Sequence, residues 1–472
     1  MRGLREVRPT PEQHKLILNT SPGIRIIRGA AGSGKTTTAL LMLRMALGFL
    51  LAERKRTGRT EPIHAVVFTF NRTLAAYVAS MADDAIKLAE AKPGDVILEV
   101  TTLAKYARSH FPELGNKILD KKDQDTLLKA NALGIALEPD FVVGEIEYLL
   151  GRFLPTNLSD YLDAERTGRG TTPRVEKKLR LEILENVIKP YIEYKQENGV
   201  VDWNDLTFGL ATKKGMSIDI AIVDETQDFS ANQLRAVVNQ LADPCYATFV
   251  LDTAQRIYTR GFTWKEIGLD VRPEHTYRLE RNYRNTTEIA TFASQLLDER
   301  NFDEDATLPL FSATAMGNRL PVIFSGKFSE QVSFAIDFIK AEVDLTKETA
   351  AFLHPKGGGW FSYLRGELTV NGLEYAETTR VGEWPEGDEQ IALSTIHSAK
   401  GLEFDHVFLL GLSDECFIYE DDDDDDAYLR VRRLVAMAIT RARKSVTLGY
   451  KSETKPSFID LFDASTFEPK TP

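Results

Sequence analysis

Eight residues near the N-terminus have the types and spacing of a phosphate-binding loop. Residues 29–36 read Gly-Ala-Ala-Gly-Ser-Gly-Lys-Thr and fit the pattern G-x-x-x-x-G-K-[ST]. Glycines let the backbone approach phosphates, and a helix N-terminus points N–H groups at their charge. We therefore expect Lys35 to reach the outer phosphates of a nucleotide and Thr36 to hold Mg²⁺ through its hydroxyl. The residues expected to contact the nucleotide are Gly29, Ala30, Ala31, Gly32, Ser33, Gly34, Lys35, Thr36 and Thr37.

Two adjacent carboxylates follow a second apolar segment. Asp224 and Glu225 come directly after residues 218–223, which read as a buried strand. In a chain with a phosphate loop, Asp224 is suited to hold Mg²⁺ and Glu225 to orient or deprotonate the attacking water. The alternative is an acidic turn that caps the helix expected from Ala231. The phosphate loop favours the first interpretation.

Two glutamines are further candidates for nucleotide contacts. Gln13 opens a short helix just upstream of the phosphate loop, and its amide can pair with a donor and an acceptor on adenine. Taken alone, Gln13 also fits an ordinary helix surface. Gln255 follows the apolar residues 247–251 and is placed to sense the terminal phosphate or its water.

A third group of residues could contact a polynucleotide. Phe70, Asn71 and Arg72 end an apolar strand, and ligands of open α/β sheets meet the carboxyl ends of strands. They could touch a sugar-phosphate chain or stack on a base, although an ordinary strand-to-helix turn fits them equally well. Tyr258 is either a stacking platform or a core residue, and His397 by itself fits a structural histidine.

Composition narrows the class of protein. The 472 residues, 43% hydrophobic and 27% charged, predict a soluble chain of two to four domains. A net charge of −12 argues against general affinity for nucleic acid but not against a local basic groove. Part of the acidity is concentrated in residues 420–426, which we expect to form a solvated loop.

The location we expect is the cytoplasm. Cys245 and Cys416 provide neither a disulfide framework nor a zinc spacing, which suits a reducing compartment. No secretory signal is expected at the N-terminus. The most apolar segment, residues 39–52, contains Arg44 and is too short to span a bilayer, so we expect no membrane contact and interpret it as the helix after the phosphate loop.

The elements that position these residues alternate between strands and helices. The phosphate loop lies between an apolar strand and a helix expected over residues 37–51. Between residues 105 and 199 the strand signal vanishes and apolar residues recur at helical spacing. Strand-and-helix alternation returns afterwards and continues through the second half. The fold class predicted is therefore α/β.

The order of the motifs resembles the UvrD/Rep-like helicases of superfamily one. That resemblance implies two RecA-like domains of the phosphate-loop NTPase type with parallel sheets, plus a mostly helical insertion in the first. The expected division is residues 1–104 and 200–278 for the first domain, 105–199 for the insertion and 279–472 for the second domain. The resemblance rests on seven motifs. In chain order they are Gln13, residues 29–36, residues 224–228, Asp252 with Gln255 and Tyr258, residues 282–284, Thr395 with His397 and residues 400–404, and Ala438 with residues 440–442.

The resemblance also implies roles for particular residues. Tyr283 would stack on the adenine that Gln13 reads, and Glu403 would contact the sugar. Arg284 and Arg441 would reach the terminal phosphate from the second domain, which makes domain closure depend on ATP. Single-stranded DNA would cross both domains near Phe70, Asn71, Arg72, Thr102, Tyr258 and His397.

Several residues depart from the family pattern. Thr37 stands where arginine is frequent, and Leu251 where glycine is usual. The aromatic residue expected shortly after Tyr258 is missing, with Phe262 or Trp264 as its replacement. The second half is also too short for a large accessory domain.

We expect ATP hydrolysis with Mg²⁺ and a helicase or translocase that acts on single-stranded DNA or a 3′-tailed duplex. Movement from 3′ to 5′ is implied by the resemblance alone. The alternative is an ATP-driven regulatory or assembly subunit of a DNA-repair or phage-defence complex, which unwinds weakly by itself and binds a protein such as a nuclease or repair factor.

Overall fold

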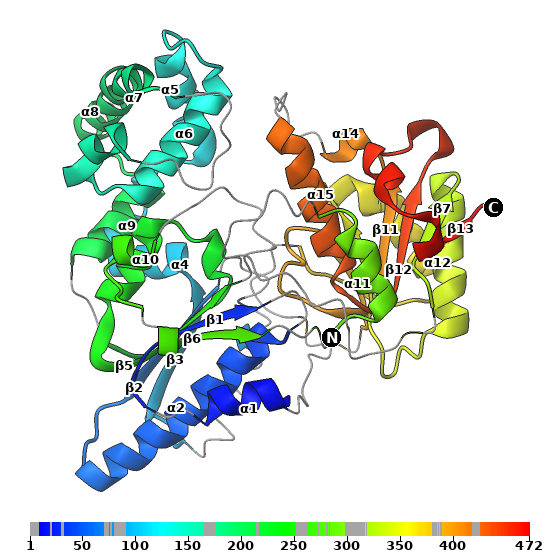
Figure 1. Cartoon of the computed structure of the whole chain (residues 1–472), viewed down its shortest axis with the longest axis horizontal. Helices are drawn as coiled ribbons and strands as arrows, with labels where there is room; N and C mark the ends of the chain where they lie inside the picture. Colours follow the sequence, from blue (N-terminus) through cyan, green and yellow to red (C-terminus); the bar gives the residue numbers. More distant parts are fainter. Residues whose placement is uncertain are drawn as a thin grey trace.

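The protein contains two parallel β-sheets flanked by helices, which confirms the α/β class. Figure 1 shows the sheets side by side, with a group of helices beyond the first one. The computed structural model describes residues 9–18, 21–29, 33–69, 75, 78–79, 91–164, 175–213, 217–251, 263–271, 273–279, 282, 284–297, 317, 319–379, 385, 387, 389–417 and 425–472.

The first sheet has the strand order β3-β2-β4-β5-β1-β6. Its central strands are nearly continuous apolar runs, as expected when helices cover both faces of a parallel sheet. The strands are β1 (Gly23–Gly29), β2 (Ile63–Thr69), β3 (Val96–Thr102), β4 (Ile218–Val223), β5 (Leu241–Leu251) and β6 (Thr276–Leu279).

Alternate residues of β1 show which helices cover which face of this sheet. Ile27 packs with Leu16 of α1 (Pro11–Ile17) and Met42 of α2 (Lys35–Thr57). Ile26 points to the opposite face, in the cluster that contains Phe249 and Leu234. The helices of that second face are α4 (Leu103–His110), α9 (Trp203–Thr212) and α10 (Ala231–Asn239).

Helix α2 is longer than the sequence predicted. It spans 23 residues instead of the expected 37–51, and its length and composition alone would allow it to cross a membrane. Its buried residues Leu43 and Leu47 instead pack in one cluster with Val67 and Ile222 of the sheet. A core helix of a globular domain has this same composition, so α2 gives no support for a membrane span.

The helical segment inserted before α9 has its own core, which includes Leu128, Ile146 and Tyr191. The Asn232 amide nitrogen of α10 anchors it by donating to the carbonyls of Leu150 and Phe153, both at 2.8 Å. Its helices are α5 (Lys121–Ala132), α6 (Pro139–Arg152), α7 (Lys177–Ile183) and α8 (Lys189–Asn198), with a π-helical turn (Leu184–Ile188) joining the last two.

The second sheet has the order β13-β7-β12-β11-β8-β10-β9. Along β11, Phe408 packs with α12 and α13 on one face, whereas Leu409 packs with α11 and α15 on the other. The strands are β7 (Val322–Ser325), β8 (Ala350–His354), β9 (Tyr375–Glu377), β10 (Ile391–Thr395), β11 (Phe404–Leu412), β12 (Ala442–Tyr450) and β13 (Glu468–Lys470). The helices are α11 (Thr287–Ser294), α12 (Phe328–Glu342), α13 (Ser362–Val370), α14 (Asp414–Phe417) and α15 (Asp425–Ile439).

The acidic run differs in part from its prediction. Residues 418–424 lie outside the described residues, but Asp425 and Asp426 form the start of α15 rather than a loop.

Candidate nucleotide-binding site

The phosphate loop connects the end of β1 to the start of α2. Lys35 Nζ donates to the carbonyl oxygen of Gly29 at 2.8 Å. Gly34 adopts a φ of +75°, and an added Cβ there would lie 2.5 Å from Gln13 Nε2. Both the backbone conformation and the close approach of Gln13 therefore require glycine at this position.

Gln13 is buried and ties α1 to the phosphate loop. Its Nε2 donates to the Gly34 carbonyl at 3.2 Å, and its Oε1 accepts from the Thr10 backbone N–H at 2.8 Å. Thr10 is the residue that caps α1, so one amide both completes the cap and holds the loop. Adenine recognition by Gln13 stays a prediction.

The two residues predicted to hold Mg²⁺ lie together. Thr36 Oγ1 donates to Asp224 Oδ2 at 2.8 Å, although 188 positions separate them in the chain. Burial and the adjacent charge of Glu225 raise the pKa of the Asp224 carboxyl. A hydroxyl and a carboxylate supply the oxygen donors that Mg²⁺ prefers, so this pair fits the ion.

Glu225 has an unusual backbone and a strongly cationic environment. Its φ is +52°, a left-handed conformation that side-chain-bearing residues rarely adopt. Burial by itself raises the pKa of Glu225, but the charges of Lys400, Lys35 and Arg441 outweigh it and keep the pKa below its ordinary value. Glu225 is therefore held ionised beside the phosphate loop.

Lys400 connects this site to the second sheet. Its Nζ lies 3.7 Å from Glu225 Oε2 and forms a buried ion pair with Asp228. Its backbone N–H donates to the His397 carbonyl at 3.3 Å, so one short turn carries both residues. No role was expected for Lys400 from the sequence, although its position three residues after His397 in the same motif was an available signal.

The segments that carry the two predicted arginines are bonded to each other. Asn285 Nδ2 donates to the Thr440 carbonyl at 3.0 Å, which fixes the backbone beside Arg441 against the segment of Arg284. Arg284 forms an ion pair with Glu403, and Arg441 is buried close enough to influence Glu225. The role of Asn285 was missed because its amide nitrogen donates to backbone carbonyls far along the chain, which no side-chain pattern shows.

The remaining predicted residues fall into two groups, those that the structure describes and those that lie outside the described part of the chain. Thr37 lies half-buried in the first turn of α2, and the buried Ser33 precedes Gly34. Thr102 caps α4 by accepting from the Lys105 backbone N–H at 3.3 Å. Burial and Lys400 lower the pKa of the half-buried His397. The predicted residues outside the described part of the chain are Ala30, Ala31, Gly32, Phe70, Asn71, Arg72, Gln255, Tyr258 and Tyr283.

Comparison with known families agrees with this arrangement. The model described as the UvrD/REP helicase N-terminal domain matches residues 10–263, which is more than half of the chain, and the UvrD-like helicase C-terminal domain matches residues 366–453. The chain therefore belongs to the UvrD/REP helicase family.

Individual relatives match parts of the chain. A probable DNA helicase II homolog of Mycoplasma pneumoniae is 24% identical over 358 residues, 70% of this chain and 48% of the relative. A second protein of that organism, a probable DNA helicase, is 27% identical over 59% of this chain and 54% of the relative. The helicase Rep of Salmonella typhimurium is 38% identical over 74 residues, 16% of this chain and 11% of Rep. The chain thus spans about a tenth to about half of these relatives.

Proposed function

We propose that this chain hydrolyses ATP and uses the energy to move along single-stranded DNA. The observation that carries the proposal is the bond between Thr36 and Asp224, next to a Glu225 carboxylate that Lys400 contacts from the other sheet. A nucleotide site built from both halves of the chain can convert phosphate chemistry into relative movement of those halves.

Each residue of the site has a part in this proposal. Lys35 binds the outer phosphates, and Glu225 orients the attacking water and accepts its proton. Thr36 and Asp224 would hold Mg²⁺, which would neutralise charge on the phosphate oxygens. Arg441 and Arg284 supply bidentate donors to the charge that develops on the terminal phosphate.

The polynucleotide part of the proposal rests on family membership and on the turn shared by His397 and Lys400. A strand that contacts His397 would bias the position of Lys400 and so of Glu225. We propose 3′ to 5′ movement on the same basis.

The test is the ATPase rate of the purified chain with and without single-stranded DNA, single-stranded RNA and duplex DNA. We expect stimulation by single-stranded DNA, and a loss of at least about 100-fold for Lys35→Ala and Glu225→Gln. Glu225→Gln should still bind a fluorescent ATP analogue, which separates chemistry from binding. If none of the nucleic acids changes the ATPase rate, movement along single-stranded DNA is contradicted and a regulatory or assembly subunit is favoured.

A further inference from the structure

A basic pocket lies at one edge of the first sheet, on the face opposite α2. The pocket has a volume of about 1000 Å³ and is bounded by the last two strands of the sheet and by residues 264–271. We call it the edge pocket. Its described lining includes Arg28, Trp264, Lys265, Asp270 and Arg278.

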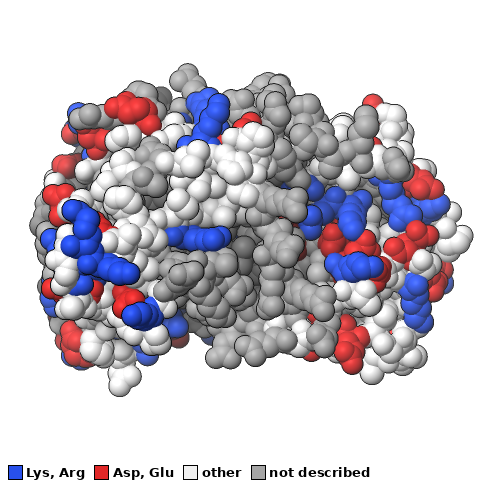
Figure 2. Space-filling view, turned by 90° about the horizontal axis from the view of Figure 1, so that it is seen from below, with Lys and Arg blue, Asp and Glu red and all other residues white. Residues whose placement is uncertain are grey.

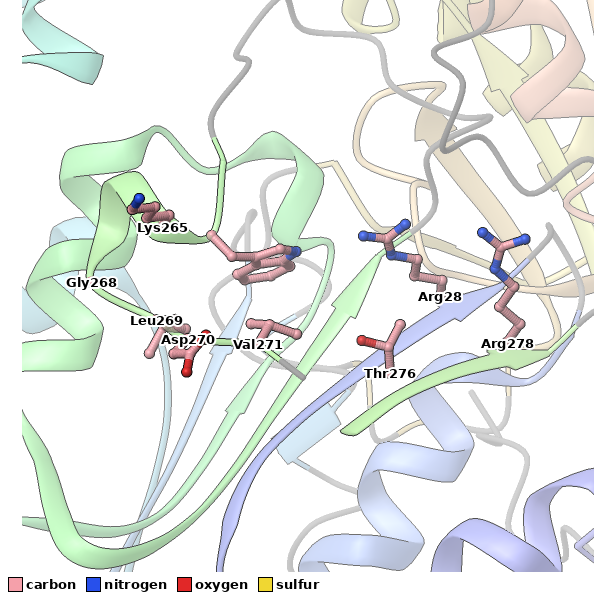
Figure 3. A pocket seen from close by; sticks show the side chains of 9 residues that line it. Arg28, Lys265, Gly268, Leu269, Asp270, Val271, Thr276 and Arg278 are labelled. Carbon is pink, nitrogen blue, oxygen red and sulfur yellow. The ribbon is translucent and has the colours of Figure 1, made fainter. Parts of the chain in front are cut away.

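Two arginines stand next to each other in the edge pocket. Arg28 of β1 and Arg278 of β6 are direct partners in the parallel register, and Figure 3 shows their side chains extending in the same direction. Like charges on neighbouring strands repel one another. With Lys265, the described lining has three cations and one carboxylate, Asp270, so the pocket attracts an anion.

The edge pocket is separate from the phosphate loop. Arg28 immediately precedes Gly29, but strand residues alternate between faces. Arg28 shares its face with Ile26, which packs among the residues of α4, α9 and α10, whereas α2 covers the other face. The phosphates of ATP at the N-terminus of α2 therefore do not account for this pair of arginines.

The surroundings favour a polynucleotide as the anion. The same face carries α4 at the β3 edge of the sheet, opposite the β6 edge where the pocket lies. Trp264 stands six positions after Tyr258, and its indole packs edge-on against Phe249 with ring centroids 5.7 Å apart. Arg152 of the helical insertion bonds Glu266 at 2.9 Å, which fixes the pocket wall to the insertion.

The charge of the edge pocket differs from that of the whole molecule. The chain has a net charge of −12, and Figure 2 shows one face on which acidic and basic side chains are intermixed. A local excess of cations in an acidic protein selects a polyanion at that place and leaves the remaining surface repulsive.

We propose that the edge pocket binds the phosphodiester backbone of single-stranded nucleic acid, with Arg28 and Arg278 on neighbouring phosphates. This inference rests on the proposed function. Guanidinium groups bind phosphate bidentately, and two of them in register set a direction for the strand. The pocket thereby extends the polynucleotide path from α4 to the β6 edge of the sheet.

The test compares Arg28→Gln/Arg278→Gln with Arg56→Gln/Arg59→Gln, which removes two exposed arginines at the other end of the same domain. Binding of a fluorescent oligothymidine is measured by anisotropy across a salt series. We expect the pocket variant to bind about 25-fold more weakly at 0.1 M salt and the salt slope to fall by about 1.4, since each lost phosphate contact removes about 0.7. The control should match wild type.

Three outcomes separate the two proposals. Failure of wild type to bind oligothymidine overturns the proposed function. Wild-type binding with an unchanged salt slope in the pocket variant overturns the edge pocket alone. A loss of affinity for a fluorescent ATP analogue, without a loss for oligothymidine, would assign the arginines to the nucleotide and also overturn it. Thermal melting of both variants excludes misfolding as the cause.

Discussion

At the scale of single residues, the central feature is the placement of Lys400. Its ammonium lies between Glu225 and Asp228, almost entirely out of solvent. A buried carboxylate that loses its cation is costly, so Lys400 both stabilises the contact between the halves of the chain and positions Glu225. Because Lys400 and His397 share one turn, we propose that this lysine is a positioning residue through which nucleic acid influences hydrolysis.

Replacement of Lys400 should therefore uncouple hydrolysis from nucleic acid. We expect Lys400→Met to reduce the ratio of DNA-stimulated to basal ATPase by about fivefold or more, the usual size of a coupling between sites. Lys400→Arg, which keeps the charge, should recover part of the ratio, and the exposed Lys451→Met should leave it unchanged. An unaltered ratio in a folded Lys400→Met protein would contradict this role.

A second residue-scale feature is His354 at the end of β8. Its Nδ1 accepts the backbone N–H groups of Lys356 and Gly357, both at 3.2 Å, and its ring stacks on Trp360. An Nδ1 that accepts two N–H groups carries no proton. Burial, with help from Lys356, lowers the pKa of His354 to about 4.

This lowered pKa predicts a loss of stability in mild acid. Between about pH 6.5 and pH 4 the unfolded chain protonates His354 while the folded chain does not, so stability falls as pH falls. From pH 7 to pH 5 the contribution lost is about 2 kcal/mol.

Urea unfolding at both pH values measures this loss. The stability difference between wild type and His354→Gln should shrink by about 2 kcal/mol at pH 5. The exposed His14→Gln is the control. A difference that does not depend on pH would show that His354 has no such effect.

At the scale of elements, the helical insertion is attached to the first sheet through α6 and α10. The amide of Asn232 satisfies two buried carbonyls at the end of α6, and Gly151 allows the close approach because an added Cβ would lie 3.1 Å from Ser230 Cβ. The insertion is thus held at a defined position relative to the edge pocket.

Asn232→Ala should weaken this attachment. Leaving the carbonyls of Leu150 and Phe153 without this donor should cost about 2 kcal/mol and speed proteolysis of the insertion. Asn198→Ala removes an exposed amide and should change stability by less than about 0.5 kcal/mol. Equal losses in the two variants, measured by urea unfolding, would argue against a special role for Asn232.

At the scale of the whole molecule, the two sheets meet through the ion pairs of Lys400. If ATP is bound between the halves, its presence should change the distance between them. This change in distance can be measured with dyes on introduced cysteines, because both native cysteines are buried. Burial raises the pKa of the Cys245 thiol to about 11 and that of Cys416 above its ordinary value, so neither competes for a thiol-reactive dye.

We expect energy transfer between dyes on Lys92→Cys and Glu453→Cys to change when a non-hydrolysable ATP analogue binds. Both positions are exposed; Lys92 precedes β3 of the first sheet, and Glu453 follows β12 of the second. The same labelled protein with Lys35→Ala should show no change at that analogue concentration, because the phosphate contact is lost. Identical transfer with and without the analogue in wild type would contradict closure.

The sequence alone predicted the α/β class and, by resemblance, two parallel sheets with a helical insertion. It also assigned Thr36 and Asp224 to one site, because a carboxylate after a strand, in a chain with a phosphate loop, is suited to share Mg²⁺ with the hydroxyl of that loop. It missed the length of α2, since its charged last turn does not look apolar. It also missed the start of α15, because an acidic run looks like a loop when the helix N-terminus is not known.

The order of residues along the chain determined the local features: which turn has the pattern of a phosphate loop, which strands are buried and which carboxylates follow them. Only the tertiary structure decided that Lys400 lies beside Asp228, 172 positions away, and that Arg28 stands next to Arg278. Such contacts depend on strand order and register. Strand order and register are set by the burial of the apolar surface of the whole chain, so they cannot be predicted from a local sequence pattern.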